Sequence, residues 1–288
     1  MRPRIALATY AHAPSLAPDD QLILPALAAA GIDGEPVVWS DDDVIWETFD
    51  GVIIRSCWDY HLRRPDFRAW LERLDASRLP VWNSVALVEW NAHKSYLLDL
   101  SSRGVPIVPT KVLKDATVEH VEAVVREECW PRFVLKPAVS ASGYETHALD
   151  ARVGSATRET IRQVVAAGDV LVQPFVEEVP RDGEYSLIFI DGAFSHGAIK
   201  RAAGSEFRVQ TEHGGSVTAI EVDPSLIEAG SRVLNALPET PLYARVDGIL
   251  RGNDFLLMEL ELIEPNLFFE LRKGSEEKLV TALQRRLD

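Results

Sequence analysis

The first ninety residues alternate apolar runs with amphipathic segments, and this alternation constrains the fold more than any other feature. The runs RIALATY, EPVVWS, GVIIRSCW and PVWN predict buried strands, and the segments DDQLILPALAAAG and RRPDFRAWLERLDAS predict helices between them. Strands that alternate with helices pair in parallel, because each helix carries the chain back across the sheet. We therefore expect an α/β unit with a parallel sheet at residues 1–90.

The pattern changes after this unit. HKSYLLDLSSRG predicts a helix, and short strands from residue 130 onwards predict a mostly antiparallel sheet, interrupted by one helix at ATRETIRQVVAAG. The last third predicts a helix at DPSLIEAGSRVLNAL, strands at YARVDGIL and DFLLMELELI, and a C-terminal helix. RGND between the two strands predicts a hairpin turn. The expected fold class is α/β (α+β).

Composition argues against several classes of binding partner and of structural site. The formal net charge of −14 argues against nucleic acid or an anionic membrane, because both select basic surfaces. The two cysteines lie in no CxxC or Cys/His cluster, which argues against a disulfide framework and a structural zinc site. The chain has no apolar run of about 18 residues and no signal-peptide pattern at its start, so a cytoplasmic protein is expected.

Two glutamates, Glu259 and Glu261, lie in the last predicted strand, within LLMELELIEPNLFF. Side chains alternate between the faces of a strand, so both glutamates share one face while Met258 and the leucines beside it take the other. The partner strand carries Arg245 and Asp247, which the hairpin brings towards the glutamates. Three neighbouring carboxylates repel one another unless a divalent cation lies among them, and magnesium prefers such oxygen ligands. The alternative is a solvated acidic face of an edge strand.

A lysine and a hydroxyl-rich loop follow a second predicted strand. Lys136 ends the strand, and Ser140, Ser142 and Gly143 lie in the loop behind it. Backbone N–H groups and hydroxyls of such a loop can bind phosphates beside a lysine. The spacing differs from that of a Walker A loop. The alternative is an exposed turn that follows a strand.

Basic residues in FRVQTEHGG and just before it stand out in an acidic chain. Lys200 and Arg208 could bind a phosphate or a substrate carboxylate, and arginine can hold either with two parallel hydrogen bonds. The alternative for each is an ordinary surface ion pair. His196 and His213 are interpreted as structural histidines.

Polar and aromatic residues follow the first and third predicted strands. Ligands of open parallel sheets gather at the carboxyl ends of strands, so these residues are candidate substrate contacts. The alternative is that the aromatic rings pack against the next helix. The candidates are Tyr10, Arg55, Ser56, Trp58, Asp59 and Tyr60, and His12 has the same standing as Tyr10.

Six of these features in this order resemble the ATP-grasp ligase superfamily, over residues 91–269. They are a helix-borne Lys94, the strand-end Lys136, the loop at 140–143, VQPFVEE, FRVQTEHGG, and RVD followed by MELELIEP. Within that superfamily, ATYAHAPSLAPDD, RSCWDYHLRRPDF, WNAHKSYLLDL and MELELIEP resemble the cycloserine-forming cyclo-ligases.

The resemblance implies an ATP-grasp fold in four parts. They are a pre-ATP-grasp domain at 1–90, a helical start at 91–129, a lid subdomain at 130–195 that excludes water, and a C-terminal catalytic subdomain at 196–288.

The resemblance also assigns roles to individual residues. Those that would bind ATP are Lys94, Lys136, Ser140, Ser142, Gly143, Gln173, Phe175 and Val176, with Glu177, Glu178 or Glu184 at the ribose. Those that would act on the transferred phosphoryl group or on the substrate carboxylate are Lys200, Arg208 and Arg245. Asp247, Glu259 and Glu261 would hold Mg²⁺, although the superfamily usually has asparagine where this chain has Glu261.

The implied reaction is ATP-dependent activation of a carboxylate as an acyl phosphate, followed by attack of nitrogen. In the cycloserine-forming branch, O-ureido-D-serine closes to D-cycloserine. One alternative is a ligase that joins an amino acid or peptide to an amine. Another is a nucleotide-binding protein without catalysis. The expected partner is a small amino-acid-like substrate, and a homodimer fits this class.

Overall fold

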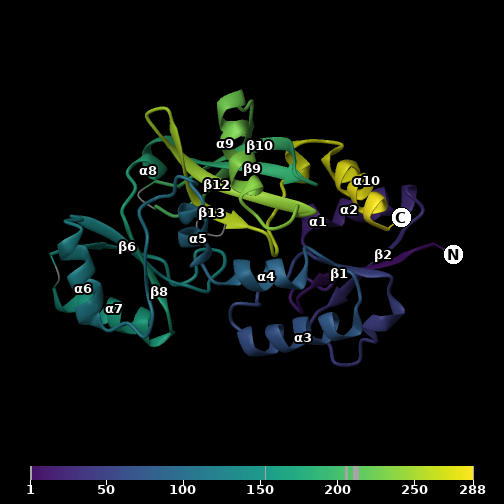
Figure 1. The fold of residues 1–288 in the computed structure, drawn as a ribbon, viewed down its shortest axis with the longest axis horizontal. Helices are drawn as coiled ribbons and strands as arrows, with labels where there is room; N and C mark the ends of the chain where they lie inside the picture. Colours follow the sequence, from purple (N-terminus) through teal and green to yellow (C-terminus); the bar gives the residue numbers. More distant parts are fainter. Residues whose placement is uncertain (1, 153, 205–206, 210–213, 288) are drawn as a thin grey trace.

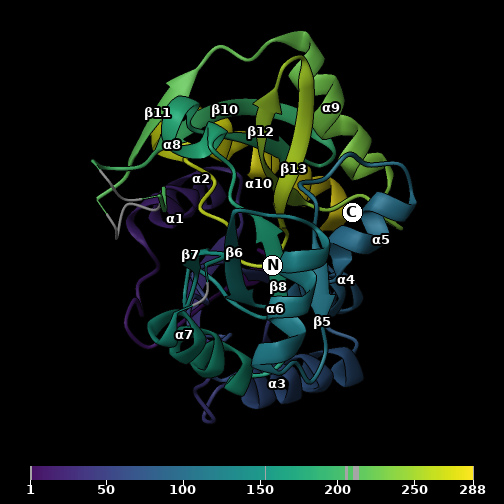
Figure 2. The ribbon, with the colours of Figure 1, turned by 90° about the vertical axis from the view of Figure 1, so that its left-hand side faces the viewer.

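The computed structural model describes residues 2–152, 154–204, 207–209 and 214–287. In these residues no helix is both long and apolar enough to cross a membrane. Figures 1 and 2 show three sheets, one at the N-terminal end of the chain and two that face each other across the middle of the molecule. Both chain ends lie on the same side in Figure 1.

The N-terminal unit contains the parallel sheet predicted from the alternation. Its strand order is β2-β1-β3-β4, and each pairing is parallel. Its strands are β1 (Arg4–Thr9), β2 (Asp33–Val38), β3 (Gly51–Ile54) and β4 (Val81–Trp82), and its helices are α1 (Pro18–Gln21), α2 (Ile23–Ala29), η1 (Trp46–Thr48) and α3 (Arg64–Ser77). Strand β3 is buried along its whole length, as expected of a strand inside a covered parallel sheet.

A small antiparallel sheet follows, with the order β5-β8-β6-β7. It consists of β5 (Lys111–Leu113), β6 (Arg132–Pro137), β7 (His147–Asp150) and β8 (Val170–Pro174), with α6 (Val118–Glu127) and α7 (Ser155–Ala166) packed on it. The sequence predicted α7 by its bounds. It gave no bounds for α6, which lies in the part expected to be helical, starts at a Thr117 capping box and has the apolar face Val118, Val121 and Val125.

The largest sheet is also antiparallel, with the order β11-β10-β9-β12-β13. It consists of β9 (Glu184–Ile190), β10 (Ala193–Arg201), β11 (Ser216–Ile220), β12 (Tyr243–Arg251) and β13 (Asp254–Glu261), accompanied by α8 (Glu178–Asp182), α9 (Pro224–Asn235), η3 (Phe269–Leu271) and α10 (Ser275–Leu287). The four-part division of the chain stays a prediction. Strand pairing indicates that its lid part would include β5 and would end before β9.

The hairpin of β12 and β13 brings together the residues that the sequence placed there. Asp247 lies opposite Glu259, and Arg245 lies opposite Glu261. The register shifts by one residue after Asp247, so the bulge leaves Met258 unpaired. The strict alternation predicted for Met258 is therefore wrong, and Met258 lines the same cavity as the glutamates.

Two short helices, α4 (Val85–Ala92) and α5 (Tyr96–Ser102), connect the N-terminal unit to the small sheet. Lys94 lies in the turn between them, so its placement on a helix was wrong. The backbone N–H of Lys94 donates to Ala138 O at 2.8 Å, which fixes this turn beside the end of β6.

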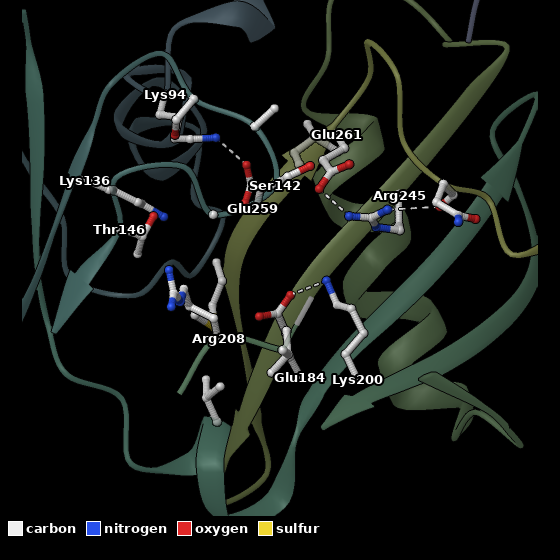
Figure 3. Close-up of a pocket in the computed structure, with 18 of the residues that line it drawn as sticks. Lys94, Lys136, Ser142, Thr146, Glu184, Lys200, Arg208, Arg245, Glu259 and Glu261 are labelled. Atoms are coloured by element: carbon white, nitrogen blue, oxygen red, sulfur yellow. Dashed lines mark hydrogen bonds and ion pairs between the residues drawn. The ribbon is translucent and has the colours of Figure 1, made fainter. Parts of the chain in front are cut away.

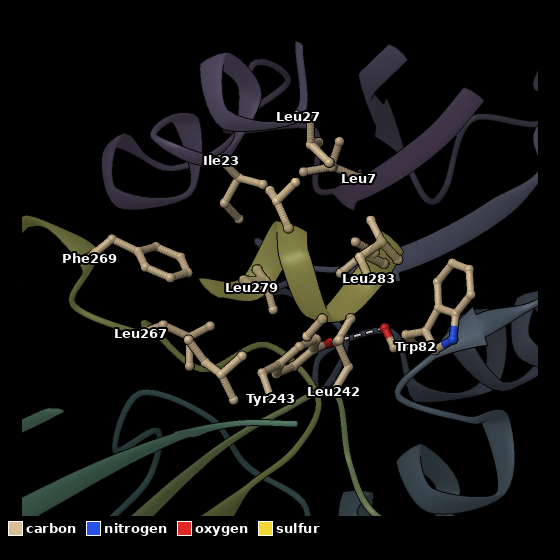
Figure 4. Packing of buried hydrophobic residues seen from close by; sticks show 14 of the residues in the cluster. Leu7, Ile23, Leu27, Trp82, Leu242, Tyr243, Leu267, Phe269, Leu279 and Leu283 are labelled. Atoms are coloured by element: carbon tan, nitrogen blue, oxygen red, sulfur yellow. Dashed lines mark hydrogen bonds between the residues drawn. The ribbon is translucent and has the colours of Figure 1, made fainter. Parts of the chain in front are cut away.

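The C-terminal helix joins the largest sheet to the N-terminal unit. Figure 4 shows α10 between α2 and the start of β12, and the fully buried side chains at this junction are Ile23, Leu27, Leu242, Tyr243, Leu279 and Leu283. Full burial of each such leucine or isoleucine stabilises the fold by about 1.5–3 kcal/mol, so this junction holds the two parts firmly.

Candidate active site

A cavity of about 430 Å³ lies between the small sheet and the largest sheet. Figure 3 shows basic and acidic side chains that face one another across it. The sequence-predicted residues that line it are Trp58, Tyr60, Lys94, Lys136, Ser140, Ser142, Gly143, Gln173, Phe175, Val176, Glu184, Lys200, Arg208, Arg245, Glu259 and Glu261.

Two lysines form the basic side near the small sheet. Lys94 is buried, and its Nζ pairs with Glu259 Oε1. Lys136 lies at the end of β6, and burial lowers its pKa. Within the residues that the structure describes, Lys136 forms no ion pair, so this wall holds a desolvated cation that an anionic ligand would stabilise.

Asp247 lies at the centre of a buried ion cluster below the cavity. It accepts from Lys200 Nζ at 2.7 Å, from Arg245 Nη2 at 3.0 Å and from Ser186 Oγ at 2.7 Å. Burial raises its pKa, but the charges of Arg245 and Lys200 outweigh burial and lower the pKa to about 2. Lys200 also pairs with Glu184 at 2.5 Å. Asp247 is therefore ionised, well satisfied and 1% exposed.

The two glutamates of β13 are more accessible. Each exposes 28% of its side chain, and Glu261 pairs with Arg245. Burial raises the pKa of Glu261 to about 7 against the opposing charge of Arg245. The pKa of Glu259 is lowered, because the charges of Lys94 and Lys136 outweigh its burial.

The carboxylates of Asp247, Glu259 and Glu261 differ in how well they could bind a divalent cation. Among the described residues no group of three His, Cys, Asp or Glu side chains is arranged as a complete metal site. Glu259 and Glu261 share a strand face and line the cavity, so they suit an ion that takes its other ligands from phosphates and water. Asp247, which contacts two cations, suits it less.

The hydroxyl-rich loop lies at the mouth of the cavity. Ser142 and Gly143 both have positive φ, +50° and +69°, and Gly143 adopts this conformation at little cost. Ser140 is buried and donates to Pro137 O at 3.3 Å. The ring of Tyr144 lies 5.2 Å from the ring of His61, so the loop contacts the N-terminal unit.

The segment after β8 supplies the other wall. Gln173 donates to Thr110 Oγ1 at 2.8 Å, and Phe175 lies under the Arg132 guanidinium, 3.8 Å from its ring centre. Of the three ribose candidates only Glu184 lines the cavity. Glu177 pairs with Arg132 on the surface, and Glu178 pairs with Arg251.

The N-terminal candidates separate into two groups. Trp58 and Tyr60 line the cavity. Arg55 and Ser56 do not: Arg55 Nη2 binds Asp20 at 2.7 Å and Pro265 O at 2.6 Å, and Ser56 Oγ donates to Asp20 at 2.6 Å. These two residues hold the fold together behind the cavity.

The remaining polar candidates also lie outside the cavity lining. Asp59 accepts from the indole of Trp39 at 2.8 Å, and Tyr10 packs its ring 6.0 Å from Trp58. His12 is exposed. His196 donates from Nε2 to Leu267 O at 2.9 Å, a structural role. His213 lies outside the described residues.

Several lining residues were missed from the sequence. They are Asn91, Tyr96, Thr146, Phe207, Glu264, Asn266, Phe268 and Glu270, among others. Those at 264–270 follow β13 directly, and the polar positions Glu264 and Asn266 beside Pro265 were a usable signal for an irregular wall.

Two sequence comparisons match this chain to known proteins. Residues 5–83 match the family model described as the D-cycloserine synthetase DcsG N-terminal domain. The chain is 31% identical to the cycloserine biosynthesis protein DcsG of Streptomyces lavendulae, over 98% of each chain.

Solved structures give the same result for the fold. The crystal structure of D-cycloserine synthetase DcsG matches with a TM-score of 0.91 and 27% identity, covering 99% of this chain and 100% of that one. D-alanine–D-alanine ligase from Bacillus anthracis matches with a TM-score of 0.70 and 14% identity, covering 99% and 97%, which shows the fold alone. The predicted ATP-grasp fold is confirmed, and the chain belongs to the D-cycloserine synthetase (DcsG) family of ATP-grasp ligases.

Proposed function

We propose that this chain is an ATP- and Mg²⁺-dependent cyclo-ligase that closes O-ureido-D-serine to D-cycloserine. A carboxylate oxygen of the substrate attacks the γ-phosphorus of ATP, the bond to ADP breaks, and an acyl phosphate results. The ureido nitrogen next to oxygen then attacks the acyl carbon and expels phosphate, which closes the ring. Hydrolysis of the carbamoyl group releases CO₂ and ammonia.

The observation that carries this proposal is the set of cations and carboxylates that line one cavity. Lys94 pairs with Glu259 and Arg245 pairs with Glu261, and Lys136 lies nearby without an ion pair among the described residues. A polyphosphate needs the cations, and the glutamates would hold a metal ion that takes its other ligands from the phosphates. The volume of about 430 Å³ lies in the range of small-molecule and cofactor sites.

The nucleotide would lie between the small sheet and β13. Lys136 would contact its phosphates, because the lysine is desolvated and forms no ion pair with the described residues. The loop residues Ser142 and Gly143 would cover the phosphates and exclude water, which an acyl phosphate requires. Glu184 is the ribose candidate that the cavity lining supports.

The cations beside the glutamates would stabilise the moving charge. Arg245 and Arg208 line the cavity and would contact the phosphoryl group or the substrate carboxylate, and Lys200 would hold Asp247 and Glu184 in place. Glu259 and Glu261, with Asp247 behind them, would hold Mg²⁺, which when bound offsets phosphate charge. The homodimer and the cytoplasmic location expected from the sequence remain predictions.

Phosphate release from ATP and Mg²⁺ tests the proposal, with a substrate panel that includes O-ureido-D-serine, D-serine and amino-acid pairs. We expect stimulation by O-ureido-D-serine and formation of D-cycloserine, identified by mass spectrometry. Stimulation by an amino-acid pair without any by the ureido compound would identify a different carboxylate–amine ligase. No stimulation by any member, with ATP still bound, would favour a non-catalytic nucleotide-binding protein.

A further inference from the structure

The segment that follows β13, residues 262–268, is irregular, yet side chains hold it at every carbonyl. We name this segment the strap. Three donors bind its first three carbonyls: Asn83 Nδ2 donates to Leu262 O (2.8 Å), Tyr243 Oη to Ile263 O (2.9 Å) and Trp58 Nε1 to Glu264 O (3.2 Å). Two arginines bind the next two: Arg55 Nη2 donates to Pro265 O (2.6 Å) and Arg245 Nη1 to Asn266 O (3.0 Å). His196 Nε2 donates to Leu267 O and Phe268 O (2.9 and 3.2 Å).

These donors come from the N-terminal unit and from two strands of the largest sheet, so the strap joins both parts. A backbone fixed at successive carbonyls holds its side chains in defined positions, which a binding wall requires. Four strap residues, Ile263, Glu264, Asn266 and Phe268, line the cavity. The strap is therefore a rigid wall of the candidate active site.

Glu264 differs from the other carboxylates of the cavity in its partners. Glu184 pairs with Lys200, Glu259 with Lys94, and Glu261 with Arg245. Within the described part of the chain, Glu264 forms neither an ion pair nor a side-chain hydrogen bond to another residue's side chain, although it is half-buried. Glu270, at the end of the wall, also has no ion pair there but is exposed.

Two aromatic residues accompany Glu264. Trp58 donates its indole N–H to the carbonyl of Glu264, and both Trp58 and Tyr60 line the cavity. Tyr60 and Glu264 line the same cavity, and burial together with the charge of Glu264 raises the pKa of the Tyr60 hydroxyl. Burial raises the pKa of Glu264 to about 8, and an ammonium group bound beside it and the aromatic rings would favour the ionised carboxylate.

We propose that Glu264, with Trp58 and Tyr60, binds the α-ammonium group of the substrate and so selects amino acids over acids that lack the amine. This inference rests on the proposed function only in taking an amino-acid-like substrate. It assigns the two charges of that substrate to different side chains. The carboxylate faces Arg208 and Arg245, and the ammonium faces Glu264.

The test compares ligands that differ only in the amine. Calorimetry with a non-hydrolysable ATP analogue and Mg²⁺ would measure binding of O-ureido-D-serine and of 3-(ureidooxy)propanoate, and of D-serine and 3-hydroxypropanoate. We expect the wild-type protein to bind the amine-bearing member of at least one pair at least about tenfold more tightly, the size typical of a desolvated charge contact. Glu264→Gln should remove that preference while the affinity for the ATP analogue stays the same.

Three comparisons make the result specific. Glu264→Asp should restore part of the preference, Glu270→Gln should reduce it less than Glu264→Gln does, and thermal unfolding shows whether each variant is folded. Equal binding of both members by the wild type, binding of neither, or an unchanged preference in folded Glu264→Gln overturns the inference. A wild type that prefers the amine but does not turn over the ureido compound overturns the proposed reaction and leaves this inference standing.

Discussion

Two buried arginines, Arg55 and Arg245, have almost the same surroundings and serve different parts of the molecule. Each pairs with an aspartate, at 2.7 and 3.0 Å, and each donates to a carbonyl of the strap. Each also lies over an aromatic ring, with centroid distances of 4.7 and 5.4 Å. These three kinds of contact therefore do not distinguish the two arginines.

The difference is access to the cavity. Arg55 is fully buried, and its acidic partner Asp20 is 4% exposed at the side chain. Arg245 lines the cavity and shares its charge with Glu261, which is 28% exposed. We call the buried ion pair of Arg55 closed and the cavity-lining pairs of Arg245 and Lys94 with the glutamates open. A closed pair can only stabilise the fold, whereas a residue of an open pair can exchange its partner for a ligand. The comparison predicts that Arg55 affects stability and that the open pairs affect catalysis.

Replacement of Arg55 gives the largest expected effect on stability. Arg55→Met leaves Asp20 buried without its cation, and breaking a buried pair in this way costs about 3–5 kcal/mol. Urea unfolding would measure the loss. Arg68→Met is the control, because Arg68 pairs with Glu72 on the surface, where such pairs contribute about 0–1 kcal/mol. Equal losses in both variants would mean that the buried pair of Arg55 contributes no more to stability than a surface pair.

Replacement of Glu259, which pairs with Lys94 in the cavity, tests whether the open pairs affect catalysis. Glu259→Gln removes a charge that would hold the metal ion and that pairs with Lys94, so we expect kcat to fall about 10²–10³-fold, equivalent to about 2.7–4 kcal/mol. The fold should persist, because Glu259 is partly exposed. Phosphate release and thermal unfolding measure the two effects. Glu47→Gln, an exposed carboxylate outside the cavity, should change neither. Full activity of Glu259→Gln would contradict the metal assignment.

The sequence predicted the parallel sheet and the acidic hairpin because both follow from local periodicity. The alternation of apolar runs requires β1 to β4 to pair in parallel, and the RGND turn sets Asp247 opposite Glu259. The bulge at Met258 was missed, because one unpaired residue leaves no signal in an alternating strand. Helix α6 was given no bounds although its capping residue Thr117 and its valine spacing were visible.

The roles of Arg55 and Trp58 could not be predicted, because they depend on contacts between distant parts of the chain. Both follow β3, where ligands gather in open sheets, and the sequence treated them alike. Arg55 reaches Pro265 and Trp58 reaches Glu264, about two hundred residues further along. The contacts with the strap bury Arg55 behind the cavity and hold Trp58 at the cavity wall. Periodicity carries no information about such pairings.

The buried neighbours Asp19 and Asp20 give the prediction with the smallest expected effect. It concerns stability around the closed pair of Arg55 and Asp20. Asp20 binds Arg55, whereas Asp19 accepts the Glu270 N–H at 3.1 Å, and its Oδ2 has no hydrogen-bond partner in the described residues. Burial raises the pKa of Asp19 to about 6. The folded protein therefore binds this proton more tightly than the unfolded chain, so this contribution to stability falls as pH rises from about 4 to about 6.

Asp19→Asn should remove that dependence. Since each unit of pKa shift corresponds to about 1.4 kcal/mol, the free energy of unfolding of the variant should rise relative to wild type by about 2–3 kcal/mol between pH 4 and pH 7. Urea unfolding of both proteins across this range measures the difference, which cancels the titration of all other groups. A difference that stays constant with pH would mean that Asp19 is ionised throughout. The buried carboxylate of Asp19 would then be stabilised without an arginine, whereas that of Asp20 binds Arg55.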